Sequence, residues 1–348
     1  MTELSASEAD LRRAAEALKA GLLVVFPTET VYGLGADAFN QKALARVFAV
    51  KGRPRFDPLI IHIAAAETLD RLADLSALAP PVREKAALLC ARLWPGPLTL
   101  VLPKRPLVPG LATSGLPTAA IRFPDHPVAR ELIRLSTGAV AAPSANRFGC
   151  LSPTRAEHAR EQLGDRIDFI IDGGKTTVGV ESTVLDLRGG TGNSGAPPLP
   201  RLLRPGGVSR ETIEALIGEI EVPLPGGEAA PLSPGQLKSH YAPRTPLSLH
   251  SPEAMAALRR KQGELCLFFS ETSRDLWLAK QDGPAAPRDS AQALSRSGDT
   301  LEAAANLFDL LHRLDRMDAS RIHAEEAPAE GLGPAINDRL FRAAGGKP

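Results

Sequence analysis

The feature that most constrains the fold of this chain is a series of short, continuous apolar segments separated by stretches with helical periodicity. Apolar residues occupy consecutive positions in these segments, which indicates strands buried on both faces. The expected strands are Leu22–Phe26, Leu59–Ile63, Leu98–Leu102, Ala119–Phe123, Ala139–Ala142, Phe169–Ile171 and Thr183–Leu187. The expected helices between them are Gln41–Val50, Pro81–Leu93, Pro127–Leu135 and Arg155–Leu163. Since some neighbouring strands have no helix between them, the pattern predicts an α/β domain with a mixed sheet.

The length of 348 residues exceeds what one hydrophobic core usually supports, so two domains are expected. A helix at Arg210–Ile217 closes the first, and the Pro- and Gly-dense segment Glu221–Pro246 predicts a stiff linker. Two further strands and two helices follow, which indicate a smaller α/β domain. They are expected at Glu264–Phe269, Leu301–Leu314, Arg321–Ala324 and Pro334–Ala343. The predicted boundaries are 1–220 for the first domain, 221–246 for the linker and 247–348 for the second domain.

The charge balance, 41 Lys and Arg against 40 Asp and Glu, argues against a chain that binds nucleic acid or membranes over its whole surface. Three isolated cysteines, Cys90, Cys150 and Cys266, contain no CxxC pair, which fits a reducing compartment. No apolar run approaches the ~18 residues of a membrane-spanning helix, and the N-terminus has no secretory h-region. We therefore expect a cytoplasmic protein without a membrane partner.

The segment PTETVYGLGADAF, Pro27–Phe39, follows the first strand with two threonines, a tyrosine and two glycines. Polar side chains at the carboxyl end of a strand are typical of ligand sites in α/β folds. A hairpin or bulge, in which Gly33 and Gly35 only satisfy the backbone geometry, explains the same residues.

A group of cations follows the helix Gln41–Val50, because Lys51, Arg53 and Arg55 lie close together on a segment that a proline keeps out of the helix. Several fixed cations on one loop suit a polyphosphate ligand, while a solvated charge run is the alternative. His62 lies within an apolar strand run, where a histidine alone is more typical of the core.

Arg122 interrupts another strand-like run, and burial of an unpaired guanidinium is costly, so it must face an anion or an edge. The loop Ala142–Thr154 begins where a further strand ends, and it offers hydroxyl and amide groups suited to phosphate, ribose or metal-bound water. These groups belong to Ser144, Asn146 and Ser152. An ordinary polar loop is the alternative here.

Two glycine patterns fail as nucleotide motifs. Gly33-Leu34-Gly35 lacks the third glycine of a dinucleotide fingerprint, and Gly173–Thr183 lacks the first glycine of a Walker loop. Polar loops and cations nevertheless recur at strand ends throughout the first domain, which is what a single ligand crevice would produce.

Nine segments in order carry a family resemblance: PTETVYGLGAD, KGRPRFDPLIIH, LWPGPLT, TAAIRFPDHP, APSANRFG, SPT, GVESTV, LLRPGG and SPGQLKSHYAP. Together they resemble the long-form threonylcarbamoyl-AMP synthases of the YrdC-like family. The resemblance implies a YrdC-like twisted mixed sheet, a linker that acts as a lid, and a smaller Rossmann-like C-terminal domain.

The resemblance also implies an activity, the condensation of L-threonine, bicarbonate and ATP to threonylcarbamoyl-AMP and pyrophosphate, with magnesium on the phosphates. A downstream complex would transfer the threonylcarbamoyl group to tRNA, with direct tRNA contact as a further expectation. The implied threonine ligands are Thr30, His62, Arg122, Ala142 and Ser182. The implied ATP ligands are Lys51, Arg53, Asp57, Thr118, Ser144, Asn146, Ser152, Arg204 and Tyr241. Lys51, Arg53 and Arg122 are the expected catalytic residues, and no protein-held metal site is expected.

Two alternatives remain at this stage. One is a double-stranded-RNA-binding module of the same fold without ATP turnover, although only 4% of the residues are aromatic. The other is a carbamoyl-transfer domain of hydrogenase maturation, which would normally lie in a longer chain with zinc-finger cysteines.

Overall fold

The computed structural model describes residues 1–188, 199–223, 241–281 and 288–345. The chain folds into two compact units. The first comprises Met1–Phe148, Pro153–Thr177 and Glu181–Gln236, and the second comprises Gly149–Ser152, Val178–Val180 and Leu237–Pro348. Most of the predicted linker, residues 224–240, lies outside the described residues, so the predicted domain boundaries stay a prediction.

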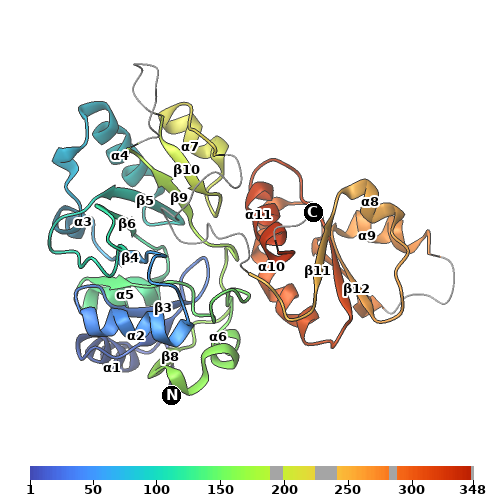
Figure 1. Ribbon diagram of the computed structural model, residues 1–348, viewed down its shortest axis with the longest axis horizontal. Helices are drawn as coiled ribbons and strands as arrows, with labels where there is room; N and C mark the ends of the chain where they lie inside the picture. The colour runs from blue at the N-terminus through green and yellow to red at the C-terminus, as the bar shows by residue number, and fades with distance from the viewer. Residues whose placement is uncertain (189–198, 224–240, 282–287, 346–348) are drawn as a thin grey trace. The chain divides into compact units, whose positions relative to one another are not determined.

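The first unit is built on a 10-stranded sheet within the described residues (Figure 1). In spatial order its strands are β1 (Thr2–Leu4), β8 (Phe169–Ile171), β2 (Val24–Phe26), β3 (Gly33–Asp37), β7 (Ala139–Ala141), β4 (Ile60–Ile63), β6 (Thr118–Arg122), β5 (Leu98–Pro103), β9 (Thr183–Asp186) and β10 (Arg201–Arg204). The sheet contains both parallel pairs, such as β4–β6, and antiparallel pairs, such as β5–β6. The sheet is mixed, which confirms the predicted fold class.

Helices connect and cover these strands. They are α1 (Glu8–Lys19), α2 (Gln41–Lys51), α3 (Glu67–Leu72), α4 (Pro80–Leu93), α5 (Pro127–Leu135), α6 (Ala156–Leu163) and α7 (Arg210–Ile217). Local signals set several of their ends. Asn40 caps α2 by accepting hydrogen bonds from two backbone N–H groups, and Gly52 ends it in the left-handed conformation.

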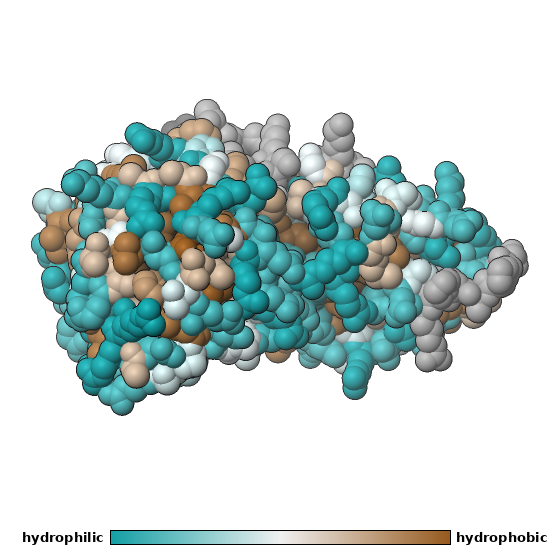
Figure 2. Space-filling model, turned by 90° about the horizontal axis from the view of Figure 1, so that it is seen from below, coloured by the Kyte–Doolittle hydropathy of each residue, from teal (hydrophilic) through white to brown (hydrophobic). Residues whose placement is uncertain are grey.

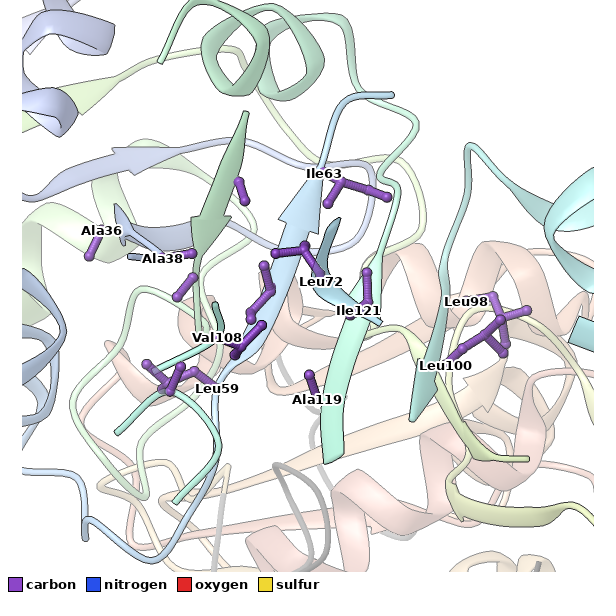
Figure 3. Packing of buried hydrophobic residues seen from close by; sticks show 14 of the residues in the cluster. Ala36, Ala38, Leu59, Ile63, Leu72, Leu98, Leu100, Val108, Ala119 and Ile121 are labelled. Atoms are coloured by element: carbon purple, nitrogen blue, oxygen red, sulfur yellow. The ribbon is translucent and has the colours of Figure 1, made fainter. Parts of the chain in front are cut away.

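Side chains of β4, β6 and β5 alternate between the hydrophobic core on one face of the sheet and the candidate site on the other. Ile61, Ile121 and Leu100 are partners in register and belong to the main hydrophobic cluster, whose packing is shown in Figure 3. Successive side chains of a strand point to opposite faces. The intervening residues, among them His62 and Arg122, therefore lie on the other face of the sheet.

The sequence predicted a loop over the whole of Pro27–Phe39, but part of this segment is a strand. Its second half forms β3, which pairs antiparallel with β2, so both glycines lie in a hairpin strand. A Cβ on Gly35 would lie 2.8 Å from a ring carbon of Phe26 and 3.1 Å from the carbonyl oxygen of Val24. The hairpin alternative thus explains the glycines, and the residues outside β3 are the loop Pro27–Tyr32 and the turn residues Ala38 and Phe39.

The second unit contains a four-stranded parallel sheet in the order β11 (Leu247–His250), β14 (Arg321–Glu325), β12 (Glu264–Ser270) and β13 (Ala291–Ser295). Its helices are α8 (Pro252–Ala257), α9 (Glu271–Leu278), α10 (Thr300–Asp315) and α11 (Gly333–Ala343) (Figure 1). The sequence had predicted only β12, β14, α10 and α11. Parallel strands joined by helices confirm the predicted smaller α/β domain.

Hydrophilic side chains predominate on the face shown in Figure 2, with hydrophobic ones scattered among them. Most large hydrophobic residues are buried, and the exposed exceptions, such as Phe56 and Leu276, are isolated in sequence. No helix in the described part of the chain is long and apolar enough to cross a membrane.

Candidate active site

Three polar side chains form a row across neighbouring strands of the first sheet. His62 on β4 pairs in register with Arg122 on β6, and Arg122 pairs in register with Thr99 on β5. All three are buried, at 3%, 3% and 0% exposure. Polar groups are buried at a cost unless they find partners, so this row marks a place built for something other than packing.

Arg122 is the centre of this row. Its Nη2 lies 2.7 Å from Oε1 of Glu29, its Nη1 donates to the hydroxyl of Thr30 at 2.9 Å, and its Nε donates to the carbonyl of Gly96 at 3.3 Å. The guanidinium is held in one orientation by groups from two loops. The sequence left Arg122 to face an anion or an edge, and within the described residues it faces an anion, the carboxylate of Glu29.

The loop that supplies Glu29 and Thr30 is stabilised by Thr28. The hydroxyl of Thr28 donates to the carbonyl of Val31 at 2.7 Å and accepts from the backbone N–H of Thr30 at 3.2 Å. It also lies 2.8 Å from the hydroxyl of Thr30. These bonds position the Thr30 side chain against Arg122.

His62 is neutral at ordinary pH. Burial, and then the charge of Arg122, lower the pKa of its imidazole to about 3. Its Nδ1 is buried and has no hydrogen-bond partner among the described residues. A neutral imidazole can exchange hydrogen bonds with a substrate hydroxyl, and it cannot serve as the counter-ion of a carboxylate.

Ser182 extends the row beyond β5. Its hydroxyl lies 2.8 Å from that of Thr99 and accepts from Nη2 of Arg204 at 3.1 Å, and Arg204 also donates to its carbonyl. A Cβ on Gly206 would lie 2.4 Å from the carbonyl carbon of Ser182. Gly206, two residues after Arg204, therefore lets the segment that follows β10 pack directly on the Ser182 backbone.

The predicted basic cluster is divided by the structure. Lys51 and Arg53 are buried, at 4% and 7% exposure, whereas Arg55 is exposed. The Lys51 ammonium donates to the carbonyls of Ser144 and Asn146 at 2.5 and 2.6 Å. This contact joins the end of α2 to the loop after β7, two segments that the sequence had assigned to one ligand.

Arg53 forms a buried ion pair with Asp57, 2.8 Å between Nη2 and Oδ1. Burial raises the pKa of Asp57, while the charges of Arg53, Lys51 and Arg204 act in the opposite direction. Three cations from α2, its following loop and β10 thus surround one carboxylate. An excess of fixed positive charge among these four side chains favours a polyphosphate.

The other predicted site residues have definite places. Thr118 begins β6, four residues before Arg122 and on the same face. The N–H of Ala142 donates to the carbonyl of Ile60 at 2.9 Å, which ties the residue after β7 to the start of β4. Ser152 and Tyr241 belong to the second unit, where the Tyr241 ring lies 5.7 Å from the ring of Phe308. The guanidinium of Arg339 lies 5.2 Å from the centre of the Tyr241 ring.

No group of three or more His, Cys, Asp or Glu side chains in the described ranges is placed to hold a metal ion.

Comparison with known families accounts for both units. The family described as "Telomere recombination" (Sua5, YciO and YrdC) matches residues 16–206. The family described as "Threonylcarbamoyl-AMP synthase, C-terminal domain" matches residues 208–345. The chain belongs to the threonylcarbamoyl-AMP synthase family.

Relatives of this synthase family match the chain along nearly its whole length. The "Threonylcarbamoyl-AMP synthase" of Bacillus subtilis is 43% identical over 353 residues, covering 99% of this chain and 96% of that protein. The protein of the same name from Pyrococcus abyssi is 44% identical over 340 residues, covering 96% and 94%. The crystal structure of P. abyssi Sua5 complexed with L-threonine superposes with a TM-score of 0.85, 39% identity and coverage of 99% and 98%.

Sequence reasoning missed Glu29 and Thr99, and although it counted Thr28 among the polar groups of its loop, it gave Thr28 no role in the site. Glu29 and Thr28 lie in a loop already singled out, but neither their burial nor the distant partner of Glu29 is visible in a linear sequence. Thr99 sits in an apolar run as Arg122 does. Its position opposite Arg122 follows only from the strand register.

Proposed function

We propose that this chain condenses L-threonine, bicarbonate and ATP to threonylcarbamoyl-AMP and pyrophosphate. The observation that supports this most directly is that two sets of buried polar side chains, each suited to a different substrate, lie next to each other. One is the row of His62, Arg122 and Thr99, suited to a small polar carboxylate. The other is the set of cations around Asp57, suited to phosphates. Ser182 lies between the two groups, because its hydroxyl is 2.8 Å from that of Thr99 and it accepts hydrogen bonds from Arg204, whose charge acts on Asp57.

In this proposal the threonine carboxylate binds Arg122, and its hydroxyl is placed by the neutral imidazole of His62 and the hydroxyls of Thr30 and Ser182. The backbone around Ala142 completes the proposed threonine site. A planar guanidinium that donates hydrogen bonds to Thr30 and Gly96 is well suited to orient a carboxylate.

ATP binds through Lys51, Arg53 and Arg204, with Asp57, Thr118, Ser144 and Asn146 as further ligands. Ser152 and Tyr241 complete the proposed ATP set. The threonine ammonium releases one proton to solvent, and the free amine combines with bicarbonate to form a carbamate and water. A carbamate oxygen then attacks the α-phosphorus in line, and pyrophosphate leaves. Positioning and charge stabilisation supply the catalysis, so no protein nucleophile is required.

Magnesium fits this site as a companion of ATP rather than as a protein-held ion. The carboxylate near the cations, Asp57, is already paired with Arg53, and the side-chain oxygens of Ser144 and Asn146 are neutral donors. When bound, magnesium would offset the charge of the phosphates, with Asn146 in its outer shell.

We also propose that the product passes to a downstream threonylcarbamoyl-transfer complex that modifies tRNA, and that these steps take place in the cytoplasm. The segment 221–246 is proposed to act as a lid that excludes water from the labile anhydride.

The test is a pyrophosphate-release assay with purified chain, ATP and magnesium. Release should require L-threonine and bicarbonate together, and equal release with threonine omitted would refute the proposal. The RNA-binding alternative predicts instead a salt-sensitive RNA complex without any pyrophosphate.

A further inference from the structure

Glu29 is a buried carboxylate that the proposed reaction leaves without a task. It is 6% exposed, and both carboxylate oxygens are buried without accepting a hydrogen bond from any described residue. Its contact with Arg122 at 2.7 Å is an ion pair that leaves its hydrogen-bonding capacity unused. A buried carboxylate normally satisfies several lone pairs, so this one is suited to an additional donor.

The charged and titratable groups around Glu29 indicate what kind of hydrogen-bond donor could bind it. Arg122 is its described cationic partner, and Arg122 is also the proposed ligand of the threonine carboxylate. His126 lies near enough for the charge of Glu29 to act on it, but burial lowers its pKa and favours the neutral ring. The second nearby imidazole, His62, is neutral as well.

A substrate carboxylate that reaches Arg122 must therefore share one guanidinium with the carboxylate of Glu29. Two carboxylates at one site repel each other unless a cation accompanies the second. An α-amino acid brings its own cation, because the ammonium is attached to the carbon that bears the carboxylate. A zwitterion leaves the net charge of the buried pair unchanged.

We propose that Glu29 is the ammonium-binding residue of the threonine site, and that it makes the site specific for α-amino acids over other carboxylic acids. The Glu29–Arg122 pair is exchanged on binding for two ion pairs, Arg122 with the substrate carboxylate and Glu29 with the substrate ammonium. This inference rests on the proposed function, since it assumes that threonine binds at Arg122.

The exchange predicts opposite effects on two ligands of nearly equal shape. L-Threonine carries the ammonium, whereas the 2,3-dihydroxybutanoate of the same configuration carries a hydroxyl in its place. In Glu29→Gln the ammonium loses its counter-ion, so threonine should bind roughly tenfold to hundredfold more weakly. The hydroxy acid no longer competes with a resident carboxylate for Arg122, so it should bind as well as before or better.

The experiment is calorimetric titration of the full chain with each ligand, for wild type, Glu29→Gln and the control Glu325→Gln. Glu325 is a matched control because it is a buried glutamate, 5% exposed, in the second unit, where it accepts hydrogen bonds from Phe269 and Ser273. Wild type and the control should both prefer threonine by about tenfold or more. Glu29→Gln should lose that preference.

Equal weakening of both ligands in Glu29→Gln, or threonine affinity within about twofold of wild type, would overturn the inference. If Glu29→Gln does not fold, wild type still decides, because equal affinity for the two ligands excludes an ammonium site. Failure of the proposed function looks different: wild type would then neither bind threonine nor require it for pyrophosphate release.

Discussion

The buried pair of Glu29 and Arg122 allows a stability prediction that does not depend on catalysis. The Arg122→Met substitution removes the guanidinium and leaves the carboxylate of Glu29 buried without its cation. It also removes donors to Thr30 and Gly96. Breaking one side of a buried ion pair typically costs about 3–5 kcal/mol, and each lost neutral hydrogen bond adds about 1 kcal/mol.

The electrostatic attraction between Glu29 and Arg122 is similar in size to this cost of breaking the pair. Two unit charges about 4 Å apart interact by roughly 4 kcal/mol at an effective dielectric constant near 20. Each single substitution, Glu29→Gln or Arg122→Met, forfeits this attraction while keeping the burial cost of the remaining charge. The double variant removes both charges, so its loss of stability should be smaller than the sum of the two single losses, by up to about 3 kcal/mol as measured coupling energies of contacting residues run.

Urea unfolding followed by fluorescence measures this coupling. The chain has two tryptophans, and in a Trp277→Phe background only Trp94 reports, from the turn that leads into β5. The exposed pair Glu131–Arg134 provides the control cycle, for which the coupling should be much smaller. If the stability loss of the Glu29→Gln, Arg122→Met double variant equals the sum of the two single losses within about 0.5 kcal/mol, the reasoning is refuted.

Three further outcomes follow from the structure. The pKa of His62 is near 6.5 in the unfolded chain and about 3 in the folded chain, so protonation of the unfolded state lowers the free energy of unfolding as the pH falls. Between pH 6.5 and 5 this loss is about 2 kcal/mol. Urea unfolding of His62→Gln should not show this pH-dependent loss. Gly35→Ala places a Cβ 2.8 Å from a ring carbon of β2 and should cost about 1–3 kcal/mol, whereas Gly110→Ala, with no atom within 4 Å, should be nearly neutral in the same assay. Arg53→Ala should raise the KM for ATP roughly tenfold to hundredfold in the pyrophosphate assay, while the exposed neighbour Arg55→Ala should not; equal effects would contradict the assignment of Arg53.

Much of the secondary structure of the first unit could be predicted because its signals are local. The helix Pro127–Leu135 and the strand Phe169–Ile171 were predicted with the bounds that the structure has. β3 was not predicted, since its glycines are read as turn residues until the ring of Phe26 across the hairpin is taken into account. In the second unit, β13 was missed as well, and its sequence AQALS has too few large apolar residues to signal a buried strand.

The chemistry of the candidate site was partly predictable, since individual polar residues in apolar surroundings are visible in a sequence. Arg122 had to face an anion or an edge, and Lys51 and Arg53 suited phosphates. Which anion Arg122 faces was not predictable, because Glu29 lies far earlier in the chain, on a different loop. Nor did the charge pattern distinguish the buried Arg53 from the exposed Arg55, since both follow the same helix and only the family resemblance separated them.

The sequence by itself therefore determined the classes of element and the inventory of charged and polar groups, because apolar runs, caps and isolated cations act within a few residues. The tertiary structure alone decided the strand order β4–β6–β5, and with it the row of His62, Arg122 and Thr99. It also decided the ion pair between Glu29 and Arg122. Strand order and register depend on the packing of side chains far apart in sequence, and a shift of one residue would have turned Arg122 into the hydrophobic core.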